Sequence, residues 1–143
     1  MDLYGHLLNL FLPKEVNNVP HFVTNTQIDK ALSFATDAHL GQKRKYTGED
    51  YINHPIAVAD WVSKVSNNSE MIQAALLHDT VEDCCVELAE INYVFGSNVM
   101  QLVSELTDVS KPEDGNRAYR KQLDREHTAL GSPESHTIKL ADL

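Results

Sequence analysis

The segment TQIDKALSFATDAHL, residues 26–40, carries the pattern that decides the fold class. Its apolar side chains recur every three or four residues, which is the spacing of one face of an α-helix. That face consists of Ile28, Ala31, Leu32, Ala35 and Ala38. Thr26 is a suitable N-cap, and Asp29 follows three residues later in the manner of a capping box. We therefore predict an amphipathic helix that begins at this point.

The same helical spacing continues from this segment to the last residue. Further helices are predicted over 56–65, 70–84, 86–95, 98–109, 117–130 and 134–143. Their boundaries are marked by prolines, capping residues and glycines, namely Pro55, Ser69, Gly96, Gly131, Ser132 and Pro133. Strand patterns are essentially absent. The predicted fold class is therefore all-α, a compact helical bundle, in which Trp61 is expected to pack into the core because it lies on an apolar stripe.

Length and composition are those of one globular domain. The 143 residues are 42% hydrophobic and 23% charged, which excludes disordered and collagen-like chains. No apolar run reaches the roughly 20 residues of a membrane-spanning helix. Residues 1–16 lack the basic start and the cleavage site of a secretory signal, so we expect no membrane partner and a cytoplasmic location.

The net charge of −9 disfavours nonspecific binding to nucleic acid and to anionic membranes. It remains compatible with a small anionic substrate, because a bound divalent cation can reverse the field within one site. Cys84 and Cys85 are adjacent and match no CxxC motif, so they are predicted to be reduced structural thiols. The sequence predicts no oligomeric state.

The stretch AALLHDTVED, residues 74–83, carries the strongest chemical signal. On a continuous helix, His78, Asp79, Glu82 and Asp83 would project along one side over about one turn. Three carboxylates and an imidazole beside a buried apolar run repel one another unless a cation holds them. A divalent ion such as Mn²⁺, Fe²⁺ or Zn²⁺ suits this donor set. The alternative is an exposed acidic helix face with a solvated histidine.

Other candidates lie before and after this stretch. His54 precedes Pro55 at the start of a predicted helix, where it could meet His78 from a neighbouring helix. Asp142 follows an apolar stretch near the end of the last predicted helix. Arg44 and Lys45 belong to a basic run in an acidic chain, and an arginine there could pair with a phosphate or stack on a base. Each of these residues, taken alone, also has an ordinary structural explanation as a packed, capping or solvated side chain.

Taken in order, these pieces resemble the HD-domain metal-dependent phosphohydrolases, and more narrowly the hydrolase domain of RelA/SpoT proteins and their small stand-alone relatives. The resemblance spans roughly residues 27–143 and is carried by ATDAH, GQKRKYTGEDYINHPIAVA, AALLHDTVED, FGSNVMQLVSELTDVSK and IKLADL. It implies a helical HD domain over residues 26–143, preceded by an N-terminal extension, residues 1–25. The family pattern continues past KLAD, so the resemblance also implies a domain truncated at its C-terminus.

The resemblance further implies an activity and a set of site residues. The implied reaction is hydrolysis of the 3′-pyrophosphate of the guanosine alarmones (p)ppGpp by a metal-activated water, with Mn²⁺ as the typical cofactor. The implied roles are metal ligation by His54, His78, Asp79 and Asp142, acid–base catalysis by Glu82 and Asp83, and nucleotide contacts by Arg44 and Lys45. Two alternatives stay open: a phosphohydrolase of another nucleotide, such as NADPH or a deoxynucleotide, and a truncated module that binds nucleotide or metal without hydrolysis.

Overall fold

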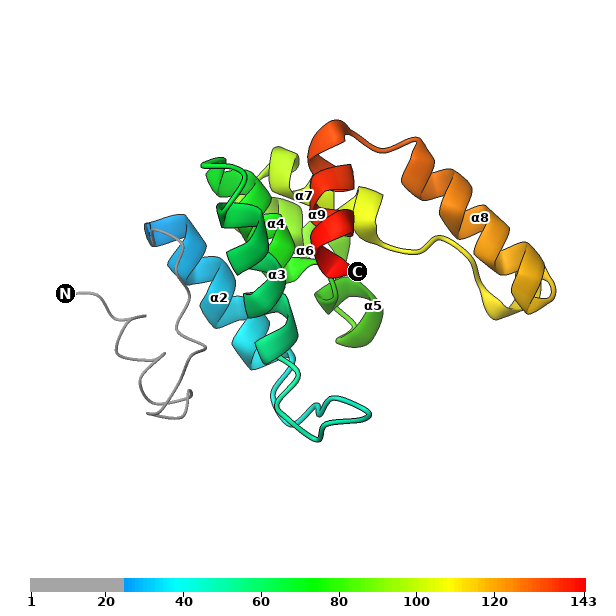
Figure 1. Ribbon diagram of the computed structural model, residues 1–143, viewed down its shortest axis with the longest axis horizontal. Helices are drawn as coiled ribbons and strands as arrows, with labels where there is room; N and C mark the ends of the chain where they lie inside the picture. Colours follow the sequence, from blue (N-terminus) through cyan, green and yellow to red (C-terminus); the bar gives the residue numbers. More distant parts are fainter. Residues whose placement is uncertain (1–24) are drawn as a thin grey trace.

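The computed structural model describes residues 25–143, and in this range the chain forms α-helices joined by loops (Figure 1). The helices are α2 (Thr26–Ala38), α3 (Asn53–Ser63), α4 (Ser69–Leu77), α5 (Thr80–Asp83), α6 (Leu88–Phe95), α7 (Ser97–Leu106), the 3₁₀ turn η1 (Pro112–Asp114), α8 (Arg117–Ala129) and α9 (Pro133–Asp142). The only extended pairing within residues 25–143 is an isolated bridge between Lys43 and Asp50. The predicted all-α class is confirmed.

Two further expectations concern the chain as a whole. The predicted N-terminal extension, residues 1–25, lies outside the described residues except for Asn25. Among the helices of residues 25–143, none combines the length and the apolar character needed to cross a membrane.

Helix α4 forms the centre of the bundle. All its residues from Met71 to Leu77 are buried, and it packs against α2, α3, α7 and α9. Helix α9 joins this core through Ile138, which has no exposed surface. Burying such a side chain contributes about 1.5–3 kcal/mol. The last helix is therefore held in the core four residues before Asp142.

Helix α8 projects away from the bundle (Figure 1). None of its residues is buried, and its main contacts are with α7 and η1. Asp124 ties it to the preceding loop by accepting hydrogen bonds from the amides of Val109 and Ser110, at 3.0 and 2.9 Å. The helix is thus attached mainly through polar contacts at its base.

The start of two helices differs from prediction by one residue. Asn25, and not Thr26, caps α2 by accepting a hydrogen bond from the amide of Ile28 at 2.9 Å. Asn68, and not Ser69, caps α4. In both cases an asparagine side-chain oxygen satisfies a free amide of the first turn, which is a preferred capping arrangement. The cap predicted at Ser132 is confirmed.

The helix predicted over 70–84 is wrong as a continuous element, because the chain breaks after Leu77. The side chains of His78 and Thr80 bond the carbonyl oxygens of Ala75 and Leu77, at 2.6 and 2.8 Å. Such local side-chain bonds compete with the helical hydrogen-bond ladder. Two helices, α4 and α5, therefore replace one, and the four polar side chains of the stretch do not form a single row.

The prediction that Trp61 packs in the core is also wrong. The buried face of α3 is formed by Pro55, Ile56, Val58, Ala59 and Val62. Trp61 lies at the flank of this face and is 60% exposed, with the ammonium of Lys64 4.2 Å from its ring centroid. The apolar stripe is therefore narrower than the sequence indicates.

Candidate metal centre

His78 lies at the break between α4 and α5 and is buried. Its Nδ1 lies 2.6 Å from the carbonyl oxygen of Ala75, which can only accept, so Nδ1 carries a proton and Nε2 holds the lone pair when the ring is neutral. Nε2 is 3.0 Å from Oδ2 of Asp79 and 3.3 Å from Oδ1 of Asp142, but neither contact has the direction of a hydrogen bond. The structure thus holds a buried ring nitrogen without a hydrogen-bond partner, facing two carboxylates.

His54 approaches the same point from the first turn of α3. Its Nε2 lies 2.7 Å from Oδ1 of Asp142 and 3.8 Å from Oδ2 of Asp79. The rings of His54 and His78 are 5.5 Å apart between centroids. Side chains from α3, α9 and the α4–α5 break therefore converge on one point.

The four side chains do not converge equally. His54, His78 and Asp142 each offer one ligand atom, and these atoms all lie within 4.8 Å of one another. Asp79 contacts both imidazoles but lies outside this group of three. Two imidazole nitrogens with carboxylate oxygens suit a borderline divalent cation such as Mn²⁺, Fe²⁺ or Zn²⁺. The unpartnered Nε2 of His78 fits such an ion, because the atom otherwise has no hydrogen-bond partner.

The negative charges of the carboxylates in this cluster favour a positive charge between them. Burial opposes protonation of His78, but the carboxylates of Asp142 and Asp79 outweigh it and raise the pKa of His78 to about 10. The imidazoles of His54 and His78 hold the pKa of Asp142 well below its usual range. Burial opposes ionisation of Asp79, yet His78 and Tyr51 lower its pKa. Without a metal ion, a proton on His78 takes the position that a cation would occupy.

Tyr51 is a site residue that the sequence reasoning did not single out. Its phenol donates a 2.6 Å hydrogen bond to Oδ2 of Asp79, and its ring lies between His39 and His54. Burial and the neighbouring Asp79 raise the pKa of Tyr51, so the phenol remains a donor. The sequence feature that could have identified Tyr51 is its position three residues before His54 in the segment YINHP.

Glu82 and Asp83 form hydrogen bonds with groups outside the ligand cluster. Glu82 Oε1 accepts a 2.6 Å hydrogen bond from the amide of Asp108, and Asp83 accepts one from Gln42 at 3.3 Å. Desolvation raises the pKa of Glu82, and the charges of Asp108, Asp79 and Asp83 raise it further against the opposing amide bond. Glu82 therefore holds a proton more readily than an ordinary glutamate.

A second polar network adjoins the centre. The Nδ1 atom of His39 lies 2.8 Å from Oε1 of Gln42 and 3.2 Å from Sγ of Cys84. Burial, with the charges of Asp83 and Asp79, raises the pKa of the Cys84 thiol to about 11. The thiol is therefore protonated at neutral pH, and both cysteines are free, as predicted.

The basic loop lies beside Tyr51. The guanidinium of Arg44 is 5.8 Å from the centroid of the Tyr51 ring, and Arg44 is half-buried. Lys45 is exposed and lies over Tyr46. Of the two predicted basic residues, the structure brings Arg44 toward the metal ligand candidates, whereas Lys45 lies at the loop tip.

Comparison with known proteins identifies the family. A family model described as HD domain matches residues 31–130, which is more than half of the chain. The chain belongs to the HD domain family. This agrees with the predicted resemblance and with the helical architecture described above.

Relatives within the HD domain family carry names that specify a reaction. Human guanosine-3′,5′-bis(diphosphate) 3′-pyrophosphohydrolase MESH1 is 40% identical over 119 residues, which cover 81% of this chain and 65% of the human protein. The Aquifex aeolicus protein named guanosine-3′,5′-bis(diphosphate) 3′-pyrophosphohydrolase is 45% identical over 119 residues, covering 81% of this chain and 16% of that protein. The match thus spans just under two thirds of the human relative and a small part of the bacterial one.

A solved structure gives the same grouping. It is described as a metazoan ortholog of SpoT that hydrolyses ppGpp and has a role in starvation responses. It matches this HD domain with a TM-score of 0.74 at 32% sequence identity, covering 84% of this chain and 67% of that chain. The fold of residues 25–143 is therefore the fold of that protein over most of its length.

Proposed function

We propose that this HD domain hydrolyses the 3′-pyrophosphate of guanosine 3′,5′-bis(diphosphate) with a divalent metal ion as cofactor. The observation that carries the proposal is the buried, unpartnered Nε2 of His78, which faces His54, Asp79 and Asp142. The names of the relatives supply the substrate: MESH1 and the Aquifex protein are both 3′-pyrophosphohydrolases of this nucleotide.

His54, His78, Asp79 and Asp142 would hold the ion, and we propose Mn²⁺ because mixed imidazole and carboxylate donors suit it. When bound, the cation lowers the pKa of a coordinated water and polarises phosphoryl oxygens. The chain orients its own donors for this purpose. Ala75 sets the tautomer of His78, and Tyr51 fixes the carboxylate of Asp79, as supporting hydrogen bonds do in metal sites.

Glu82 is proposed as the acid–base group, with Asp83 beside it. Its raised pKa makes the carboxyl easier to protonate than that of an ordinary glutamate, which suits a group that takes up and releases a proton. The amide of Asp108 holds its Oε1, which leaves the other oxygen for the proton. Gln42 orients Asp83 in the same region.

Arg44 is proposed to contact the nucleotide, with Lys45 as a second contact. The guanidinium already lies over the Tyr51 ring, next to the candidate ligand Asp79. In that place it would offset phosphate charge that the acidic centre repels, and its plane could stack on a base.

The test is release of pyrophosphate from ppGpp with added Mn²⁺, with and without a chelator. We expect release that the chelator abolishes. Asp79→Ala should lose both the bound metal and the activity. Glu90→Ala, which removes an exposed carboxylate from α6, is the matched control and should retain both.

Two outcomes would overturn parts of the proposal. Full activity of Asp79→Ala would refute the assignment of this residue to the metal. Stoichiometric metal binding without release from ppGpp would refute the alarmone reaction. Release of phosphate from NADPH or a deoxynucleotide would then identify another nucleotide as the substrate.

A further inference from the structure

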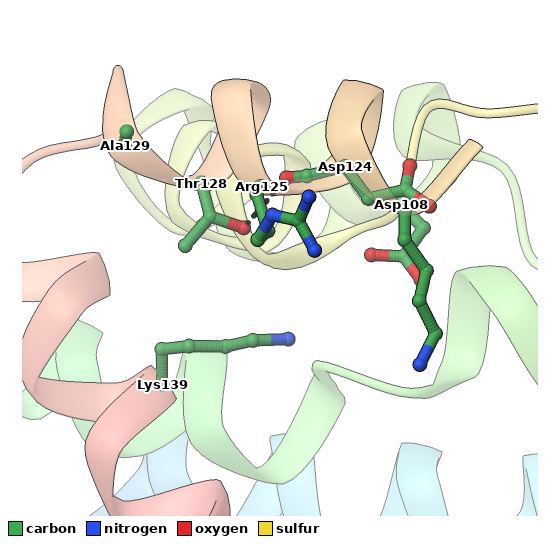
Figure 2. Close-up of a pocket in the computed structure, with 7 residues that line it drawn as sticks. Asp108, Asp124, Arg125, Thr128, Ala129 and Lys139 are labelled. Atoms are coloured by element: carbon green, nitrogen blue, oxygen red, sulfur yellow. Dashed lines mark hydrogen bonds between the residues drawn. The ribbon is translucent and has the colours of Figure 1, made fainter. Parts of the chain in front are cut away.

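A cleft of about 600 Å³ separates α8 from the bundle near α9. Its lining residues are Asp108, Lys121, Asp124, Arg125, Thr128, Ala129 and Lys139. Figure 2 shows Lys139 reaching from α9 into the space below α8, on the side where the guanidinium of Arg125 points out from that helix. The volume lies within the range of small-molecule sites, about 300–1,000 Å³.

Three cations line this cleft, namely Lys121, Arg125 and Lys139. Among the described residues, Lys121, Arg125 and Lys139 form no ion pair. Two carboxylates also line it. One is Asp124, whose carboxylate accepts hydrogen bonds from the amides of Val109 and Ser110 and from the Ser110 hydroxyl.

The other carboxylate is Asp108. Desolvation and the nearby charge of Asp124 raise its pKa, while the charges of Lys139 and His127 oppose this rise. With three cations and two carboxylates among its lining residues, the cleft carries an excess of positive charge in a chain of net charge −9. A positive concave site of this kind favours an anionic ligand.

The cleft is connected to the candidate metal centre by two short links. Lys139 lies three residues before Asp142 on α9, so both side chains project from the same side of that helix. The amide of Asp108 donates to Glu82 at 2.6 Å. A ligand that spans both places would carry one group at the metal ligands and a second anionic group in the cleft.

We propose that the α8–α9 cleft binds the 5′-diphosphate of the substrate while the 3′-pyrophosphate lies at the metal centre. This inference rests on the proposed function for the identity of the substrate. The guanidinium of Arg125 offers a planar fork for a phosphate, and the two ammonium groups match the remaining oxygens. The cleft then selects nucleotides that carry phosphates at both the 5′ and the 3′ positions of the ribose.

The first test compares two substrates, ppGpp and guanosine 3′-diphosphate, which lacks the 5′ phosphates. The variant is Lys121→Gln/Lys139→Gln. The control is Lys30→Gln/Lys64→Gln, which removes the same charge from α2 and from the C-cap of α3. We expect the ratio of kcat/KM for ppGpp to that for guanosine 3′-diphosphate to fall at least about tenfold in the variant, because each lost charged hydrogen bond weakens binding to about this extent. An equal ratio in the variant and the wild type would overturn the proposal.

The second test does not depend on turnover. Binding of inorganic pyrophosphate is measured by calorimetry in the presence of a chelator, which keeps metal out of the ligand cluster. We expect wild-type binding that weakens at least about tenfold in Lys121→Gln/Lys139→Gln and is retained in the control pair. Wild-type protein that does not bind pyrophosphate, or a variant that binds it equally well, would overturn the cleft assignment.

The two tests separate the failure of each proposal. Pyrophosphate binding that depends on Lys121 and Lys139, without any release from ppGpp, would refute the alarmone reaction and leave the anion cleft standing. Release from ppGpp with an unchanged substrate ratio would support the reaction and refute the cleft. Circular dichroism melting of both variants checks that the fold is retained.

Discussion

The ring of His78 is anchored to the carbonyl oxygen of Ala75, one turn earlier, by a hydrogen bond of 2.6 Å from Nδ1. This bond accompanies the end of α4 and leaves Nε2 buried, 3.0 Å from Asp79 and 3.3 Å from Asp142. The contact that lies at the end of the helix thus also orients the proposed metal ligand.

Tyr51→Phe should weaken metal binding without unfolding the protein. The phenol holds Oδ2 of Asp79, and loss of such a supporting hydrogen bond typically costs about 10–100-fold in metal affinity. Calorimetric titration with Mn²⁺ measures the change. Tyr93→Phe, on a side chain that is 91% exposed, is the control. Equal affinity in both variants would show that Tyr51 does not position the carboxylate.

The metal-free protein should lose stability as the pH rises from neutral to about 10. The pKa of His78 is raised from 6.5 to about 10 in the folded state, so protonation stabilises the fold fully below 6.5. That contribution is lost as the pH rises through 10. Urea unfolding in chelator at pH 6.5, 8 and 10 measures the effect.

The control for this pH dependence is His78→Gln, which lacks the titrating group. Its free energy of unfolding should change less over the same range than that of the wild type. Bound Mn²⁺ requires a neutral His78, so metal affinity should instead rise with pH. A wild-type stability that increases between pH 6.5 and 10 in chelator would contradict the charge assignment.

Glu82→Gln should keep the metal and lose most of the turnover. Removing a general acid–base group typically costs about 10²–10⁴-fold in rate. Pyrophosphate release and metal content are measured on the same preparation, with Glu90→Gln as the control on α6. If the variant loses its metal, Glu82 is a ligand, and the acid–base assignment is wrong.

Ile138→Ala should destabilise the fold by about 2–5 kcal/mol, as is typical when a buried aliphatic side chain is truncated. Because Ile138 holds α9 in the core, the metal affinity should fall as well. Leu140→Ala, on the same helix but 71% exposed, is the matched control and should change the free energy of unfolding by less than about 0.5 kcal/mol. Urea unfolding distinguishes the two, and equal losses would show that α9 is not anchored through Ile138.

Most of the fold could be read from the sequence because helical periodicity and capping are local properties. The stripe from Ile28 to Ala35 predicts α2, and the Ser132-Pro133 pair predicts the start of α9. The break at His78 could not be read in this way. It depends on which carbonyl oxygen the imidazole bonds, and the apolar period runs through the break without a change.

The exposure of Trp61 could not be predicted from the sequence for a related reason. Periodicity places a side chain on one side of a helix, but the width of the neighbouring helices decides how much of that side is covered. In the structure Val62 belongs to the buried face of α3, whereas the neighbouring Trp61 lies to one side of that face and is exposed.

The sequence by itself determined the helical class, the candidate residues and the family resemblance, because each rests on spacing along the chain. Only the tertiary structure decided how the candidates meet. It brings Asp142 within 2.7 Å of His54, although 88 residues separate them in sequence. It brings the Tyr51 phenol into a hydrogen bond with Asp79 and the Glu82 carboxylate into a hydrogen bond with the amide of Asp108. It also forms the α8–α9 cleft from residues with no shared motif. The physical reason is that such contacts depend on how helices pack around a common core, and no local pattern encodes a distance between segments far apart in the chain.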